Sequence, residues 1–144
     1  MFDSVLVVCA GNICRSPTAE YVLKQKLEGK NISVSSAGLT ALEGKPADAT
    51  ARQVALVNGV NMDAHQGRQL TSTLVAQNSV ILVMENRHLT DLFSRYPEAR
   101  GKTFLLGKWI GDKEIPDPYR KSIEAFEHIY TLIDSACSAW QKYL

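Results

Sequence analysis

The chain has 144 residues, 45% of them hydrophobic and 22% charged, which is ordinary for a globular protein with one buried core. A formal net charge of +1 excludes a whole-surface field that would attract nucleic acid, so any anion must be recognised locally. The apolar run at residues 5–9 is too short for a signal-peptide core or a membrane span. Three cysteines are too few for a disulfide framework, and we expect free thiols in a cytoplasmic protein that does not insert into membranes.

The first predicted element is a strand at residues 4–9, whose continuous apolar run is typical of a strand covered on both faces. A helix follows, with Ser16 expected as its N-cap and Pro17 at its first position. The second strand is predicted at residues 32–37. A second helix is then expected from Asp48, as N-cap, to the helix-ending pair Asn58-Gly59.

The next elements repeat this alternation. A short third helix is expected from Thr71 to about residue 76, and a second continuously apolar strand at residues 80–84. A helix over residues 86–95 should end before Tyr96-Pro97, because the residue before a proline avoids helical geometry. The fourth strand is predicted at residues 102–106.

The last helix runs from Ser122 to the C-terminus, with apolar residues in steps of three and four. Such a stripe could form a coiled-coil seam, but it is short and widened by Ile129, Leu132 and Ala136, which favours a helix packed on a sheet, with Cys137 as core filling. The elements together predict a single α/β domain over residues 1–144. We expect a three-layer sandwich with a central four-stranded parallel sheet, Rossmann-like, and helices on both faces.

The stretch VVCAGNICRSPTAE at residues 7–20 joins the first strand to the first helix, where α/β proteins bind ligands. Such a loop exposes backbone N–H groups, and the helix N-terminus adds positive potential, which favours an anion. Gly11 and Asn12 are residue types that tolerate positive φ and so allow the loop to curl into a nest of N–H groups. The known glycine-rich nucleotide motifs are missing, so a nucleotide site is not expected.

Cys9 and Arg15 lie at the two ends of this loop. Arg15 can donate two parallel hydrogen bonds to a phosphate, and a cysteine in the same positive field is expected to be a thiolate nucleophile. The alternative for Cys9 alone is simple packing at the end of a buried strand. The histidines lack metal-type spacing to the thiols, so no metal is predicted.

The segment Cys9-Ala10-Gly11-Asn12-Ile13-Cys14-Arg15-Ser16-Pro17, together with Asp117-Pro118-Tyr119, resembles the low-molecular-weight protein tyrosine phosphatase family over essentially the whole chain. The resemblance implies hydrolysis of phosphotyrosine through a phosphocysteine intermediate, without cofactor or metal. It implies that Cys9 is the nucleophile, Arg15 binds phosphate and stabilises the transition state, and Asp117 is the general acid and base. The phosphate loop would comprise Ala10, Gly11, Asn12, Ile13 and Cys14.

Other roles also follow from the resemblance. Ser16 would stabilise the Cys9 thiolate, in competition with N-capping, and His65 would support the loop, against the alternative of a lone surface histidine. Tyr119 would form one wall of the substrate crevice by stacking on the substrate ring. Leu39 and Leu42 stand in the segment of the opposite wall, where eukaryotic members often have an aromatic residue.

The sequence around Asp117 resembles the bacterial branch with Wzb, Etp and AmsI, which implies a membrane tyrosine kinase of capsule or exopolysaccharide export as partner, and a monomeric enzyme. Two alternatives remain: a thioredoxin-coupled arsenate reductase on the same fold, for which residues 80–100 lack the further cysteine, and a non-catalytic phosphopeptide-binding homologue. Cys14 is either a redox partner of Cys9 or a small buried side chain under the loop.

Overall fold

A four-stranded parallel sheet in the order β2-β1-β3-β4 forms the centre of the computed structural model, which describes residues 2–144. Its strands are β1 (Ser4–Cys9), β2 (Ser33–Gly38), β3 (Val80–Val83) and β4 (Thr103–Leu105). The predicted sheet is confirmed, and no strand end differs from its expected position by more than one residue. β3 is buried along its whole length, as a strand covered on both faces should be.

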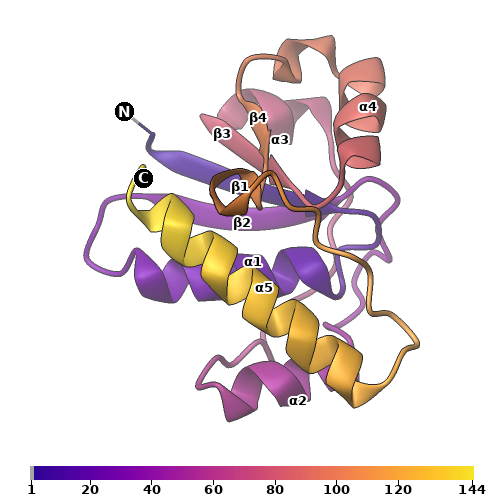
Figure 1. Ribbon diagram of the computed structural model, residues 1–144. Coiled ribbons are helices and arrows are strands. Elements are labelled where there is room, and N and C mark those ends of the chain that lie inside the picture. The colour runs from indigo at the N-terminus through magenta and orange to yellow at the C-terminus, as the bar shows by residue number, and fades with distance from the viewer. Residues whose placement is uncertain (1) are drawn as a thin grey trace.

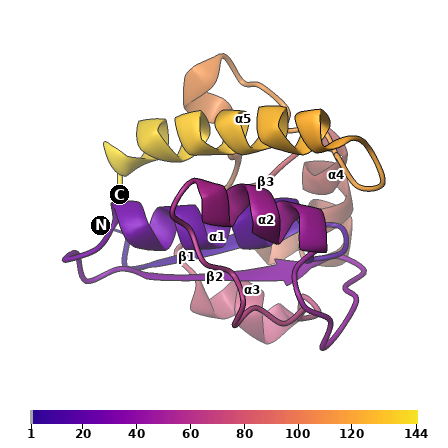
Figure 2. The same cartoon turned by 90° about the horizontal axis from the view of Figure 1, so that it is seen from below.

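Helices cover both faces of this sheet. They are α1 (Arg15–Lys26), α2 (Ala49–Val57), α3 (Ser72–Gln77), α4 (Asn86–Arg95) and α5 (Ile123–Gln141), with short 3-10 turns η1 (Pro97–Ala99) and η2 (Lys108–Ile110). Figures 1 and 2 show α1 and α5 on one face, with α2 beside them, and α3 and α4 on the other. The three-layer α/β sandwich expected from the sequence is therefore confirmed.

Side-chain caps begin three of the helices where the sequence predicted them. Asp48 accepts a hydrogen bond from the backbone N–H of Ala51 at 3.1 Å, and Thr71 and Ser122 cap α3 and α5 in the same way. The N-cap prediction for Ser16 was wrong, because α1 begins at Arg15 and Ser16 is its second residue. The Ser16 hydroxyl is instead engaged by Cys9 and Asn12, which leaves it unavailable as a cap.

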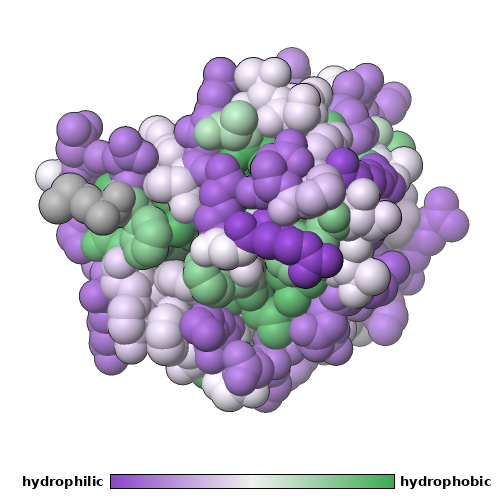
Figure 3. Space-filling model, turned by 90° about the horizontal axis from the view of Figure 1, so that it is seen from above, coloured by the Kyte–Doolittle hydropathy of each residue, from purple (hydrophilic) through white to green (hydrophobic). Residues whose placement is uncertain are grey.

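Two hydrophobic cores lie on the two sides of the sheet. α5 buries Phe126, Ile133 and Trp140 in the core that it shares with α1, so it packs within the sandwich as predicted and does not present a coiled-coil seam. Figure 3, a view from above, shows hydrophilic side chains over much of the surface and hydrophobic ones in smaller patches between them. Within residues 2–144, no helix is both long enough and apolar enough to cross a membrane.

Candidate active site

The loop that follows β1 turns its carbonyl groups outward. The carbonyls of Cys9, Ala10 and Gly11 accept hydrogen bonds of 2.9 to 3.1 Å from backbone N–H groups of residues 39, 40 and 42, and that of Ile13 accepts one of 2.7 Å from Asp48. In a trans peptide the N–H group points away from the carbonyl of the preceding residue. The N–H groups that follow these carbonyls therefore face the inside of the loop, where they can bind an oxyanion.

Asn12 holds the loop together from within. It is fully buried and adopts a left-handed φ of 58°. Its amide nitrogen donates to the hydroxyls of Ser16 at 2.8 Å and Ser36 at 2.9 Å, and its amide oxygen accepts from the backbone N–H of Arg68 at 2.8 Å. One side chain thus ties the loop to α1, to β2 and to the segment after α2.

His65 supports the same residue from the outside. Its Nε2 lies 2.6 Å from the carbonyl oxygen of Asn12, and its ring packs edge-on against Tyr21. The alternative of a lone surface histidine was wrong, since only 6% of His65 is exposed. The contact is with the backbone of Asn12, where a ring nitrogen can pair the carbonyl that the left-handed turn directs toward it.

The structure assigns the conformational requirement at the loop to residues other than Gly11. Gly11 does not have a positive φ; only Asn12 in the loop does, so the predicted curl depends on one left-handed residue. Gly38, at the end of β2, was not singled out. A Cβ atom there would lie 2.6 Å from the carbonyl oxygen of Ala10, so only glycine allows β2 to lie this close to the loop.

Cys9 ends β1 and is 3% exposed, with its sulfur 2.9 Å from the Ser16 hydroxyl oxygen. The Ser16 oxygen already accepts a hydrogen bond from Asn12, which leaves its own hydrogen free to be donated to the sulfur. A donor at this distance stabilises a thiolate more than a thiol. Ser16 therefore stands where the resemblance implied, and the strand end aims the sulfur into the loop.

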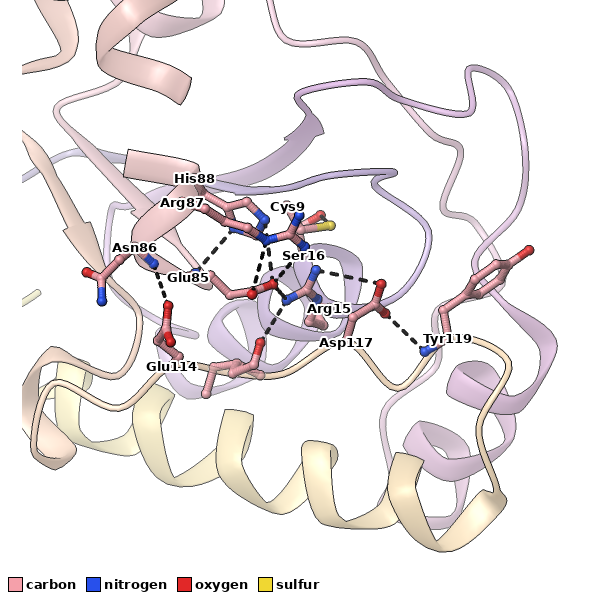
Figure 4. Close-up of polar contacts among 11 residues, drawn as sticks. Cys9, Arg15, Ser16, Glu85, Asn86, Arg87, His88, Glu114, Asp117 and Tyr119 are labelled. Atoms are coloured by element: carbon pink, nitrogen blue, oxygen red, sulfur yellow. Dashed lines mark hydrogen bonds and ion pairs between the residues drawn. The ribbon is translucent and has the colours of Figure 1, made fainter. Parts of the chain in front are cut away.

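Arg15 is 2% exposed and lies between two carboxylates (Figure 4). Its Nη1 donates to Glu85 Oε2 at 2.5 Å and to the carbonyl oxygen of Ile115 at 2.7 Å. Its Nη2 lies 3.9 Å from Asp117 Oδ2. One end of the guanidinium is thus anchored, which leaves the other end to contact a ligand.

Sequence reasoning missed Glu85. Burial by itself raises the pKa of this carboxyl, but hydrogen bonds from Arg87 and Arg15 outweigh burial and lower the pKa from 4.5 to about 2. Glu85 is therefore ionised at neutral pH and balances the buried charge of Arg15. A signal was available, because Glu85 directly follows the buried run of the third strand at the carboxyl edge of the sheet, where ligand sites form.

The loop that carries Asp117 is attached to the sheet by residues before it. Glu114 accepts a hydrogen bond from the backbone N–H of Asn86 at 2.7 Å, and Ile115 donates its N–H to the carbonyl of Met84 at 2.9 Å. Asp117 Oδ1 accepts from the backbone N–H of Tyr119 at 3.0 Å. These anchors bring Asp117 to the mouth of the phosphate loop although it is distant in sequence.

A cavity of about 120 Å³ lies over the loop, lined by Cys9, Ala10, Gly11, Ile13, Cys14, Arg15, Leu42, Asp117 and Tyr119. The structure thus brings together the predicted nucleophile, arginine, acid and two crevice residues.

The prediction that Leu39 lines the crevice was wrong. Leu39 is 4% exposed and packs in the core under α3 and α4, because its N–H and carbonyl are hydrogen-bonded to Cys9 and Gln69. Leu42, 47% exposed, is the residue of that segment that reaches the cavity.

Cys14 is a free buried thiol, as is Cys9. Burial first, and then the nearby Cys9, raise the pKa of Cys14, so it is protonated at neutral pH. Cys14 is therefore not expected to act as a nucleophile, because a protonated thiol is a poor one. The role of Cys14 as a redox partner stays a prediction.

The geometry is that of a phosphate-binding loop with a cysteine, an arginine and a carboxylic acid around one cavity. The family model of low molecular weight phosphotyrosine protein phosphatase matches residues 4–144. The chain belongs to this family. The phosphatase is 49% identical over 143 residues to the low molecular weight protein-tyrosine-phosphatase Etp of Escherichia coli K12, with 99% of this chain and 95% of the relative covered.

Solved structures agree with this assignment. Wzb of Vibrio vulnificus, in complex with benzylphosphonate, is 55% identical with a TM-score of 0.96, and 100% of both chains is covered. Wzb of Escherichia coli K30, in complex with phosphate, is 45% identical with a TM-score of 0.92, covering 100% of this chain and 99% of that one. The enzyme is a low molecular weight protein-tyrosine-phosphatase of the Wzb, Etp and AmsI type.

Proposed function

We propose that this phosphatase hydrolyses phosphotyrosine in proteins by two displacements at Cys9. The observation that carries the proposal is that Cys9, Arg15 and Asp117 line one cavity of about 120 Å³. In the first step the Cys9 sulfur attacks phosphorus, an S–P bond forms and the P–O bond to tyrosine breaks. In the second step water attacks phosphorus, the S–P bond breaks, and inorganic phosphate and the Cys9 thiolate are released.

The phosphate loop and Arg15 stabilise the charge that both steps place on the phosphoryl oxygens. The inward N–H groups need no reorganisation, because outward hydrogen bonds already fix the peptide planes. Arg15 contributes the free end of its guanidinium, since Glu85 and Ile115 hold the other end. The N–H groups and Arg15 together supply the positive potential that the negative phosphoryl oxygens need, so the proposed mechanism requires no metal.

Asp117 supplies and removes the proton. Tyrosine leaves as a phenol when Asp117 donates a proton to the ester oxygen, and the resulting carboxylate then accepts a proton from the attacking water. Its position at the mouth, 3.9 Å from Arg15 Nη2, suits a group that meets the leaving oxygen opposite the sulfur. Tyr119 and Leu42 would hold the phenyl ring between them.

The physiological substrate that we propose is a membrane tyrosine kinase of capsule or exopolysaccharide export, acted on at its cytoplasmic tyrosines. The similarity to Etp, Wzb and AmsI supports this partner. The three cysteines are all free thiols, which suits a reducing compartment. Incubation with the phosphorylated cytoplasmic domain of such a kinase from the same genome should remove its phosphotyrosine faster than that of an unrelated phosphoprotein. Equal rates would contradict this choice of partner.

Turnover of para-nitrophenyl phosphate by the wild-type protein, Cys9→Ser and Asp117→Asn tests the mechanism. Cys9→Ser should reduce turnover to background, because the serine hydroxyl is not ionised at neutral pH. Asp117→Asn should slow turnover about 10²- to 10⁴-fold for phenyl phosphate, and less for nitrophenyl phosphate, whose leaving group needs less protonation. Activity that survives Cys9→Ser would rule out the phosphocysteine route.

The two alternative functions give different results in the same preparation. A non-catalytic binder would retain phosphopeptide affinity without turnover. An arsenate reductase would consume arsenate with thioredoxin, but Cys137 is fully buried on α5 and does not line the cavity, which disfavours a thiol relay. Phosphatase turnover without arsenate reduction is the expected outcome.

A further inference from the structure

A buried histidine lies behind the arginine of the phosphate loop. His88, in the first turn of α4, is 2% exposed, and its Nδ1 accepts the backbone N–H of Glu85 at 3.2 Å. Because Nδ1 is an acceptor, the proton of the neutral ring is on Nε2. Nε2 has no hydrogen-bond partner within residues 2–144, and it lies 3.8 Å from Glu85 Oε2. Figure 4 shows His88 and Arg87 on the Glu85 side of Arg15, away from Asp117.

Burial and the neighbouring guanidinium groups keep the ring of His88 neutral at neutral pH. Burial first, and then the adjacent guanidinium of Arg15, lower the pKa of His88 from 6.5 to about 4. Arg87 lowers the pKa of His88 further, whereas the carboxylates of Glu85 and Asp91 raise it in part. His88 thus offers an N–H dipole at neutral pH without adding a second positive charge beside Arg15.

The oxygen that His88 faces is the one that holds Arg15. Glu85 Oε2 accepts from Arg15 Nη1 at 2.5 Å and from Arg87 Nη2 at 3.1 Å. The side chain of this carboxylate is 19% exposed, so N–H donors as well as burial hold it against Arg15. An ionised carboxylate that loses a donor is destabilised unless another donor replaces it.

We propose that His88 is a positioning residue for Arg15: its free Nε2–H attracts the Glu85 carboxylate and so keeps the anchored end of the guanidinium in place while the other end binds phosphate. The proposal rests on the role of Arg15 in phosphate binding that is proposed above. A purely structural role is the competing explanation, because the Nδ1 contact with the Glu85 N–H also caps α4.

Three variants separate the two roles. His88→Leu removes both the acceptor for the cap and the donor for Glu85. His88→Gln keeps an acceptor and a donor, whereas His88→Glu keeps only an acceptor, which is sufficient for a capping box. The measurements are the competitive inhibition constant of inorganic phosphate, kcat and KM for para-nitrophenyl phosphate at pH 7, and the melting temperature of each variant.

His88→Leu and His88→Glu should weaken phosphate inhibition about threefold to tenfold, the value of one hydrogen bond, and His88→Gln should restore it. The dependence of the rate on leaving group should stay as in the wild type, because Asp117 is untouched. Wild-type phosphate inhibition in both His88→Leu and His88→Glu would overturn the proposal, as would equal rescue by glutamine and glutamate. If His88→Leu does not fold, the glutamine and glutamate pair decides.

Failure of the proposed function itself is seen separately, in the wild-type protein. If phosphate does not inhibit the wild type competitively, or if turnover persists in Cys9→Ser, the proposed function of the loop is contradicted, whatever the His88 variants show. Competitive inhibition of the wild type with unchanged histidine variants would remove only the role of His88.

Discussion

Asn12 combines two functions that usually need two residues: it turns the backbone and it pairs buried polar groups. Its φ of 58° lies in the left-handed region, and its side chain makes hydrogen bonds to Ser16, Ser36 and the backbone of Arg68. Asparagine tolerates this φ better than most residues. At the residue scale, the shape of the phosphate loop thus depends on a side chain that does not face the ligand cavity.

Asn12→Ala and Asn12→Gly separate these two contributions. Both lose the side-chain hydrogen bonds and should lower the free energy of unfolding by about 2–4 kcal/mol, because buried partners are left unpaired. Alanine should cost about 1 kcal/mol more than glycine, since only alanine is strained at positive φ. Urea unfolding measures both values. Equal stability of the two variants would show that the left-handed turn relaxes without cost.

At the scale of elements, the end of β2 and the loop after β1 form one unit. The backbone N–H groups of Leu39, Thr40 and Leu42 pair the outward carbonyls of the phosphate loop, and Gly38 allows the close approach on which these bonds depend. Because β2 and β1 are parallel neighbours, both reach the carboxyl edge of the sheet side by side. The strand pairing therefore determines where the loop can bind phosphate.

Gly38→Ala should disturb this unit, and Gly11→Ala is its matched control. A Cβ atom on Gly38 would lie 2.6 Å from a backbone oxygen, whereas one on Gly11 would have its nearest neighbour, Ile13 Cγ1, at 3.8 Å. We expect Gly38→Ala to lower the free energy of unfolding by about 1–3 kcal/mol, because the backbone of the phosphate loop at Ala10 must move away from the added Cβ atom. The same movement should reduce kcat/KM. Gly11→Ala should keep wild-type stability. The reverse order in urea unfolding would contradict the close-approach argument.

At the scale of the whole molecule, the site is assembled from segments after three strands. Arg15 begins α1 after β1, Glu85 follows β3, and Asp117 lies on the long connection between β4 and α5. The parallel sheet brings these segments to one edge. The charge of the buried Arg15 is balanced there by Glu85, and His88 is buried next to this pair, so folding and protonation depend on each other.

This dependence predicts acid lability. The folded-state pKa of His88, about 4, is below its ordinary 6.5, so between these values the unfolded chain binds more protons and stability falls as pH falls. The pKa of Glu85, about 2 against an ordinary 4.5, adds a loss in the same direction between pH 4.5 and 2. Between pH 7 and 4, the slopes of the unfolding free energy against pH should differ between wild type and His88→Gln by at most about 1.4 kcal/mol per pH unit, and the variant should have the smaller slope. Parallel curves would show that His88 does not titrate in this way.

Sequence patterns were sufficient for the layers of the fold. The apolar runs of β1 and β3 predict strands buried on both faces, and Asp48, Thr71 and Ser122 start helices through contacts within one turn. They were also sufficient to place Cys9 and Arg15 on one loop, because a strand, a short connection and a helix N-terminus are adjacent in sequence. Asp117 came from its resemblance to a family motif, since periodicity contains no information about so distant a contact.

What the sequence by itself determined is the local chemistry: which elements form, and that a thiol and a guanidinium share one anion-binding loop. Only the tertiary structure decided that Leu39 faces the core, that Gly38 and not Gly11 is required by close approach, and that Glu85 holds Arg15. The physical reason is that strand order and register bring together residues from separate strands, whereas helix caps and buried strands depend on neighbours along the chain.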